Sequence, residues 1–164
     1  AIRAALTGHL VLSTLHTNDS IGAISRLVDM GVEPFLVSSS VLGVLAQRLV
    51  RKICPECKEG YFLEPDSPER AFMGDFYQDG EIIFRGKGCP NCSNTGYRGR
   101  MAIHEIFPIS KGIRELITER ASGEKVKELA YKEGMTTMQY DGFQKVLAGE
   151  TTINEIMRVA YAEL

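Results

Sequence analysis

The segment LVLSTLHTNDS, residues 10–20, joins a short apolar run to a polar cluster. Residues 10–15 are rich in Leu, Val and Thr, which is typical of a buried strand. Asn18, Asp19 and Ser20 are residue types that commonly cap the N-terminus of a helix. The segment therefore predicts a strand followed by a helix, as in an α/β domain.

Apolar residues continue at helical spacing after this segment, which predicts a helix over Asn18–Met30 that ends at Gly31. Pro34 suits the first turn of a second helix, and the pattern extends that helix through Gln47. The residues RLVRKI, 48–53, predict a strand that leads into the first cysteine.

Composition places the chain among ordinary globular proteins, with 164 residues, 44% apolar and 24% charged. No apolar run reaches the roughly 18 residues that a membrane-spanning helix needs. The net charge of -2 provides no basic field for nucleic acid. The chain starts at Ala1 without a signal peptide, and residues 1–6 resemble the tail of a helix, so we expect a piece of a longer protein.

Four cysteines form two CxxC pairs, Cys54/Cys57 and Cys89/Cys92, separated by 31 residues. Two such turns can complete a tetrahedral shell of four thiolates, which leaves no position for a reactive water and is typical of structural zinc. Free thiols or a redox pair are the alternative, but a redox CxxC usually occurs once. We predict zinc in a loop-rich module over residues 52–99.

A nucleic-acid-binding zinc ribbon is a further alternative for this module. Residues 51–100 hold eight Lys or Arg and eight Asp or Glu, so the local charge is balanced. A surface that follows phosphates needs a basic excess. We therefore expect no nucleic acid, and a module that stabilises a loop or docks a protein.

The last part of the chain, residues 100–164, predicts a strand in RMAIHEIFPIS followed by a helical bundle. Three apolar stripes, of which the second ends at Gly134 and the third at Gly149, precede a final helix that the capping-box pattern Thr152–Glu155 opens. EIIFRGKG, residues 81–88, predicts one more strand between the cysteine pairs.

His16 lies where the predicted strand ends and the helix begins. Ligands of open α/β sheets bind at that edge, and free N–H groups at a helix start favour phosphate. The alternative is that Thr17 and Asn18 cap the helix and His16 is a half-buried side chain, which the pattern alone favours. His9 is interpreted as a turn or interface residue, and His104 as a structural residue paired locally.

Three stretches together resemble the secretion ATPases of type II secretion and type IV pilus assembly: ALTGHLVLSTLHTNDS, DMGVEPFLVSSSVLGVLAQRLVR, and the paired CPxC with GYRGRMAIHEI. STLHTN resembles the His box of this family, and AQRLVR is similar to a stretch near its nucleotide site. The resemblance covers nearly the whole chain and is closer to the type II branch.

The resemblance implies the C-terminal portion of a RecA-like ATPase domain, with an inserted tetracysteine zinc module and a C-terminal helical bundle. Its parts would be residues 1–51, 52–99 and 100–164. The family works as a cytoplasmic homohexamer, peripheral at the inner membrane through platform proteins, and couples ATP hydrolysis to pseudopilus assembly.

The resemblance also assigns roles to residues. His16 would sense the γ-phosphate, while Thr14, Thr17 and Asn18 arrange the strand end. Gln47 and Arg48 would line or support the nucleotide pocket.

The phosphate loop GxxxxGK[ST] of the family does not occur in these residues. We expect that loop, and the acidic boxes that hold Mg²⁺, upstream of Ala1, so this chain alone should not hydrolyse ATP. A pilus assembly ATPase and a zinc module that docks proteins remain alternatives.

Overall fold

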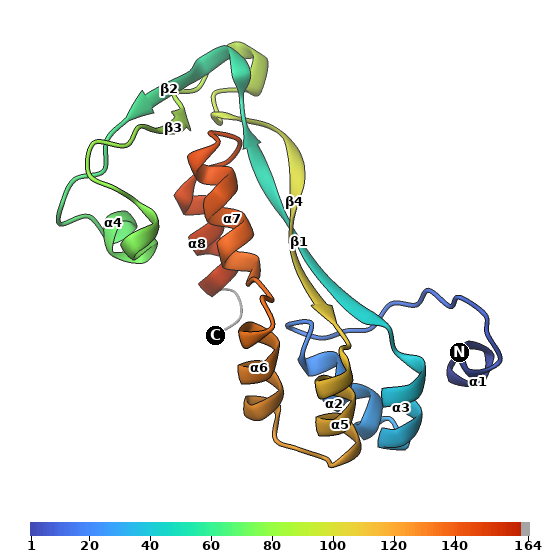
Figure 1. The fold of residues 1–164 in the computed structure, drawn as a ribbon. Coiled ribbons are helices and arrows are strands. Elements are labelled where there is room, and N and C mark those ends of the chain that lie inside the picture. Colours follow the sequence, from blue (N-terminus) through green and yellow to red (C-terminus); the bar gives the residue numbers. More distant parts are fainter. Residues whose placement is uncertain (162–164) are drawn as a thin grey trace. The chain divides into compact units, whose positions relative to one another are not determined.

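The computed structural model describes residues 1–161 and divides the chain into two compact units, whose elements are labelled in Figure 1. Unit 1 comprises residues 1–46 and 105–137, and unit 2 comprises residues 47–104 and those from 138 onward. The strands β1 (Gly43–Ile53) and β4 (Tyr97–Pro108) form a two-stranded sheet and contribute residues to both units.

Unit 1 is built mainly from helices. These are α1 (Ile2–Leu6), α2 (Gly22–Asp29), α3 (Pro34–Ser40), α5 (Lys111–Thr118) and α6 (Gly123–Lys132). Helix α3 packs against α1, α2 and α5, and α5 packs against α6. The buried core of this unit consists of Ile24, Val37, Phe107, Ile109, Ile113, Ile117, Val126 and Ala130.

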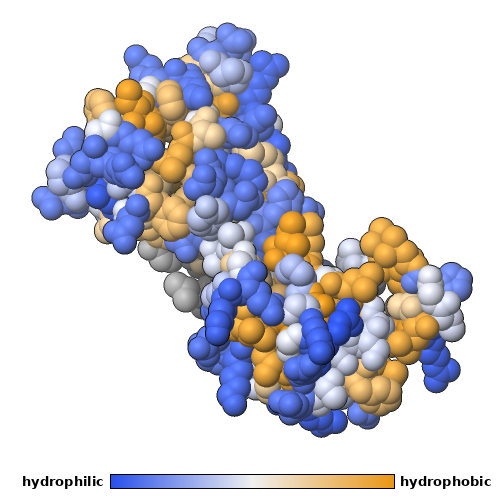
Figure 2. Space-filling model, in the orientation of Figure 1, coloured by the Kyte–Doolittle hydropathy of each residue, from blue (hydrophilic) through white to orange (hydrophobic). Residues whose placement is uncertain are grey.

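The strand predicted over residues 10–15 does not form, and its expected burial was wrong. The segment has neither helix nor strand, and Leu10 and Leu12 are 78% and 88% exposed. A strand requires a hydrogen-bonded neighbour, but the described strands pair only as β1 with β4 and as β2 with β3. Figure 2 shows the resulting apolar surface over α1 and the segment that follows it.

The second predicted helix is shorter than expected, because α3 ends at Ser40 and β1 begins at Gly43. Residues 43–50 alternate between exposed and more buried positions, as a strand requires. A Cβ atom at Gly43 would lie 3.3 Å from the carbonyl oxygen of Phe107, so the glycine permits close approach to β4. Pairing with β4 thus overrides the local helical pattern.

Unit 2 contains the antiparallel pair of β2 (Lys58–Tyr61) and β3 (Ile83–Gly86), in which Lys58 lies opposite Gly86. Its helices are α4 (Pro68–Met73), α7 (Met138–Leu147) and α8 (Ile153–Tyr161). Helix α8 packs against α4 and α7, and α7 also contacts β3. The buried core consists of Val50, Met73, Tyr77, Ile83, Ile103, Phe143, Val146, Ile153, Ile156 and Val159.

Three short 3-10 turns complete unit 2: Pro55–Cys57, Gly74–Phe76 and Pro90–Cys92. The first and third carry the cysteine pairs, and the proline that opens each turn has the backbone angle that such a turn needs. No helix of the described residues has both the length and the apolar character needed to cross a bilayer.

The helices predicted for the last part of the chain are confirmed as α5 to α8. Gly134 and Gly149, predicted as helix ends, have φ angles of +95° and +69°, which favour glycine. The capping box is only half formed: the Thr152 Oγ1 accepts a 3.3 Å hydrogen bond from the Glu155 N–H, while the Glu155 carboxylate binds elsewhere.

Candidate functional site

The four cysteines are brought together in unit 2, with all four Sγ atoms within 4.8 Å of one another. Cys54 precedes the first 3-10 turn and Cys57 ends it, while Cys89 precedes the third turn and Cys92 ends it. The Sγ–Sγ distances are 3.8 Å for Cys54–Cys89, 3.9 Å for Cys57–Cys92 and 3.7 Å for Cys89–Cys92.

These distances fit a tetrahedral metal site. Sulfurs bound to one zinc ion at about 2.3 Å form a tetrahedron with edges of about 3.8 Å. A disulfide instead requires an S–S bond of about 2.05 Å. Two of the cysteines are buried and two are half-buried, so a bound ion would be screened from solvent.

The backbone determines where the sulfurs lie. The Cys57 carbonyl accepts a 2.9 Å hydrogen bond from Lys87, which follows β3, and the Cys54 N–H donates a 2.9 Å bond to the Gly96 carbonyl. A Cβ atom at Gly86 would lie 2.0 Å from the Gly96 carbonyl oxygen, so only glycine fits there. The second cysteine turn is therefore held directly against β3.

Backbone N–H groups also point at the sulfurs. Gly88 donates to the Cys57 Sγ at 3.3 Å, while the Cys92 Sγ accepts from Cys89 at 3.2 Å and from Gly96 at 3.3 Å. Such bonds favour the thiolate form, which is the form that binds metal.

The pKa values of the thiols differ because their surroundings differ. Burial raises the pKa of Cys57 to about 12 and also raises that of Cys89, where neighbouring thiols add to the effect. Burial acts on Cys92 too, but the N–H groups of Cys89 and Gly96 lower its pKa to about 6. The Cys92 thiolate thus forms near neutral pH, whereas Cys57 and Cys89 require a nearby cation to offset their charge.

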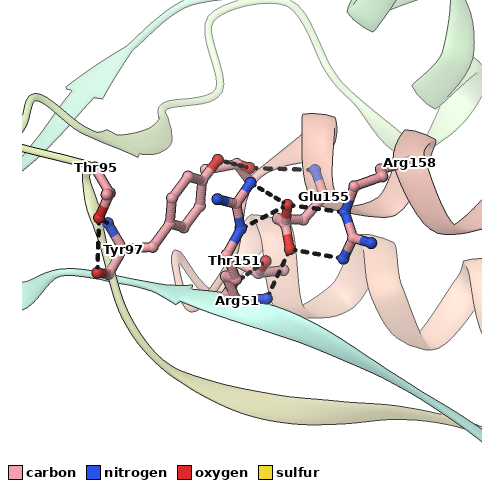
Figure 3. Close-up of polar contacts among 7 residues, drawn as sticks. Arg51, Thr95, Tyr97, Thr151, Glu155 and Arg158 are labelled. Atoms are coloured by element: carbon pink, nitrogen blue, oxygen red, sulfur yellow. Dashed lines mark hydrogen bonds and ion pairs between the residues drawn. The ribbon is translucent and has the colours of Figure 1, made fainter.

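An ion-pair cluster links β1 to the start of α8 (Figure 3). It is built on Arg51, which lies three residues before Cys54. The Glu155 carboxylate, 1% exposed, accepts hydrogen bonds from the Arg51 N–H at 2.8 Å and from the Arg51 guanidinium at 2.7 and 3.0 Å. Arg158 donates two further bonds at 3.1 and 3.2 Å. The Arg51 guanidinium also lies 4.1 Å from the centre of the Tyr97 ring.

This cluster controls the ionisation of Glu155. Burial alone would raise the pKa of the carboxyl, but the hydrogen bonds from Arg51 and Arg158 lower it to about 2. The same hydrogen bond from Arg51 raises the pKa of the guanidinium. Nearby, the Thr151 hydroxyl donates to the Arg51 carbonyl at 2.8 Å, so the backbone that leads to Cys54 is fixed from two sides.

The predicted His segment lies in unit 1, between α1 and α2. Thr14, His16 and Asn18 are exposed, and Thr17 is half-buried. The Thr17 hydroxyl donates to the Asp19 carbonyl at 2.9 Å. At the start of α2, the Asp19 carboxylate accepts a 2.6 Å hydrogen bond from the Gly22 N–H.

Gln47 and Arg48 lie in β1 and belong to unit 2; Gln47 is exposed and Arg48 is half-buried. His104, predicted to be a structural residue paired locally, contacts Asp141, which is 37 residues away in the sequence. Its N–H donates to the Asp141 carboxylate at 2.8 Å, and its ring Nδ1 lies 3.8 Å from the same group. The His9 Nδ1 lies 3.2 Å from the Thr7 hydroxyl.

Two buried carboxylates were missed by sequence reasoning. Glu105 is 8% exposed and accepts bonds from Ser20, while Glu155 holds the two arginines described above. A sequence signal existed for Glu105, because it stands between apolar residues in an alternating strand. Glu155 was recognised only as a capping residue.

The sequence profile described as "Type II/IV secretion system protein" matches residues 1–158. The chain belongs to this family. It is 49% identical to "Type II secretion system ATPase E" of Vibrio cholerae over 97% of its own length, which is 31% of that relative. It is 45% identical to "Type IV pilus assembly ATPase PilB" of Thermus thermophilus, over 96% of this chain and 18% of the relative.

Solved structures share the α/β fold. The pilus retraction motor PilT with bound ADP matches with a TM-score of 0.60 at 24% identity, covering 96% of this chain and 34% of PilT. The ATPase DotB of Legionella pneumophila matches with a TM-score of 0.60 at 17% identity, over 98% of this chain and 34% of DotB. The family resemblance predicted from the sequence is confirmed, and the chain spans about a third of its type II relatives.

We expect the substitution Glu155→Gln to destabilise the protein by about 2 kcal/mol at pH 7, because it replaces the charge-assisted hydrogen bonds from Arg51 and Arg158 with neutral ones. The folded pKa of about 2 lies below the ordinary 4.5. The carboxylate therefore stabilises the fold above about pH 4.5, and this contribution is lost as the pH falls towards 2.

Urea unfolding between pH 7 and pH 3 measures this effect. The exposed Glu150→Gln is the matched control and should keep the pH dependence of the unchanged protein. Glu155→Gln should show a shallower dependence. Equal stability of the two variants across this range would contradict the assignment.

Proposed function

We propose that this chain is the C-terminal part of a motor ATPase that drives pseudopilus assembly in type II secretion. The observation that carries the proposal is family membership over residues 1–158, together with 49% identity to a type II secretion ATPase. A type IV pilus assembly ATPase is the second candidate, supported by the 45% identity to PilB.

In this proposal the 164 residues supply only part of the catalytic apparatus. They contain no phosphate loop, so the lysine and Mg²⁺ ligands on which phosphoryl transfer depends would come from the rest of the full-length protein. His16 would contact the γ-phosphate, with Thr14, Thr17 and Asn18 beside it in the segment. Gln47 and Arg48 would support the nucleotide pocket.

The full-length protein would work as a homohexamer on the cytoplasmic side of the inner membrane, held there by platform proteins. Movement of the platform would follow the ATP cycle. Complementation separates the two candidates: we expect the full-length gene to restore protein secretion in a type II ATPase deletion strain. Restored piliation without secretion would favour the pilus assembly role.

We further propose that Cys54, Cys57, Cys89 and Cys92 bind one structural zinc ion in the module of residues 52–99. The sulfur distances near 3.8 Å and the donated N–H groups support this assignment. Bound zinc would cross-link the two cysteine turns. Because all four ligands come from the protein, the site would leave no position for water.

For the metal, we expect about one zinc per chain by elemental analysis, and loss of structure in the module after chelation. Gly86→Ala should weaken zinc binding about ten-fold or more, because the added methyl group displaces Gly96, which donates to the Cys92 sulfur. The control is Gly123→Ala, where the added Cβ would meet no atom within 4 Å. Folded, metal-free protein with all four thiols reduced would refute the zinc assignment.

For the His segment, we expect His16→Ala in the full-length protein to lower kcat for ATP roughly 10- to 100-fold while changing KM little, because a γ-phosphate contact acts mainly in the transition state. Steady-state ATPase assays measure both constants. His9→Ala, in the same unit, is the matched control. An unchanged kcat in His16→Ala would remove the proposed sensor role, and the 164-residue chain alone should show no turnover.

A further inference from the structure

Strand β4 carries a carboxylate, Glu105, at a position where the alternating pattern predicts a buried apolar side chain. Ile103 and Phe107, two residues on either side of Glu105, are 1% and 0% exposed. Glu105 lies on the same face of the strand and is 8% exposed. Burial of a carboxylate is unfavourable unless hydrogen bonds replace its water, so the group requires specific partners.

Ser20 donates two hydrogen bonds to this carboxylate. The Glu105 Oε1 accepts a 3.1 Å hydrogen bond from the Ser20 N–H and a 2.5 Å bond from the Ser20 hydroxyl. Ser20 is 0% exposed, so water does not compete for these bonds. Charge-assisted bonds to a buried carboxylate are among the stronger hydrogen bonds in proteins.

Ser20 fixes the C-terminal end of the His segment. It stands four residues after His16 and just before α2, which begins at Gly22. The turn between them is held locally by the Asp19 carboxylate, which accepts from the Gly22 N–H at 2.6 Å, and by the Thr17 hydroxyl. The two hydrogen bonds from Ser20 attach this turn to Glu105 of β4, 85 residues away in the sequence.

We propose that Glu105 is a positioning residue for ATP hydrolysis, which acts through Ser20 to hold the His16 segment in place. This inference rests on the proposed ATPase function and assigns Glu105 no contact with nucleotide. Displacement of a catalytic contact by about 1 Å can cost about a hundred-fold in rate, so the loss of such an anchor should reduce turnover strongly.

The test uses full-length protein with Glu105→Leu, Glu105→Gln and Ser20→Ala. Glu105→Leu removes both acceptors, and we expect kcat for ATP to fall about ten-fold or more with KM little changed. Glu105→Gln retains one acceptor oxygen and should recover most of the rate. Ser20→Ala loses only the hydroxyl bond and should show an intermediate loss.

Matched controls are Glu119→Gln, an exposed carboxylate on the same unit, and Ser39→Ala, whose hydroxyl bonds locally to the Phe35 carbonyl. Both control variants should have the kcat of the wild-type protein. If Glu105→Leu does not fold, the comparison of Ser20→Ala with Ser39→Ala decides the question. The proposal would be overturned if Glu105→Leu and Ser20→Ala both had the kcat of the wild-type protein. If Glu105→Leu is unfolded, a wild-type kcat in Ser20→Ala would overturn it.

Hydrogen exchange at the Ser20 amide provides a readout that does not depend on catalysis. We expect exchange of this amide to become about ten-fold faster in Glu105→Leu and to stay slow in Glu105→Gln. Unchanged exchange in Glu105→Leu would overturn the anchor. Full-length wild-type protein that lacks ATPase activity would instead refute the proposed function, while the exchange result would still decide the anchor.

Discussion

Close contact between Gly86 and Gly96 is the constraint on which the geometry of the cysteine cluster depends. A Cβ atom on either glycine would lie 2.0 or 2.4 Å from the carbonyl oxygen of the other. Gly96 also accepts from the Cys54 N–H and donates to the Cys92 sulfur, so one residue contacts both cysteine pairs. The two cysteine turns can approach each other because neither Gly86 nor Gly96 has a side chain between them.

Each unit uses one buried carboxylate to attach a helix start to a strand. In unit 1 the Glu105 carboxylate binds Ser20, next to the start of α2. In unit 2 the relation is reversed: Glu155, in the first turn of α8, binds Arg51 of β1. Both carboxylates are almost fully buried, so removal of a hydrogen-bond donor costs the desolvation of a buried acceptor and not merely a surface contact.

The sequence predicted features set by local pattern and missed those set by distant partners. Helices α5 to α8 followed from apolar spacing and glycine stops, and the spacing of the cysteines placed all four in one cluster. The long strand β1 was not predicted through Gly43–Gln47, because only pairing with β4 distinguishes it from a helix. The roles of Glu105 and Glu155 depend on partners 85 and 104 residues away, which no local pattern reveals.

The contact between Arg51 and Glu155 joins residues of unit 2 that are synthesised 104 residues apart. The segment leading to Cys54 is fixed by Thr151 and Glu155, so it stays incomplete until residues 151–155 have left the ribosome. Contacts that close such long loops form slowly, since the entropy of loop closure opposes them. Cys54 and Cys57 are thus synthesised before Thr151 and Glu155, whose contacts with Arg51 fix the segment that leads to Cys54. The cysteine cluster of unit 2 can reach its final geometry only after the residues of α8 are available.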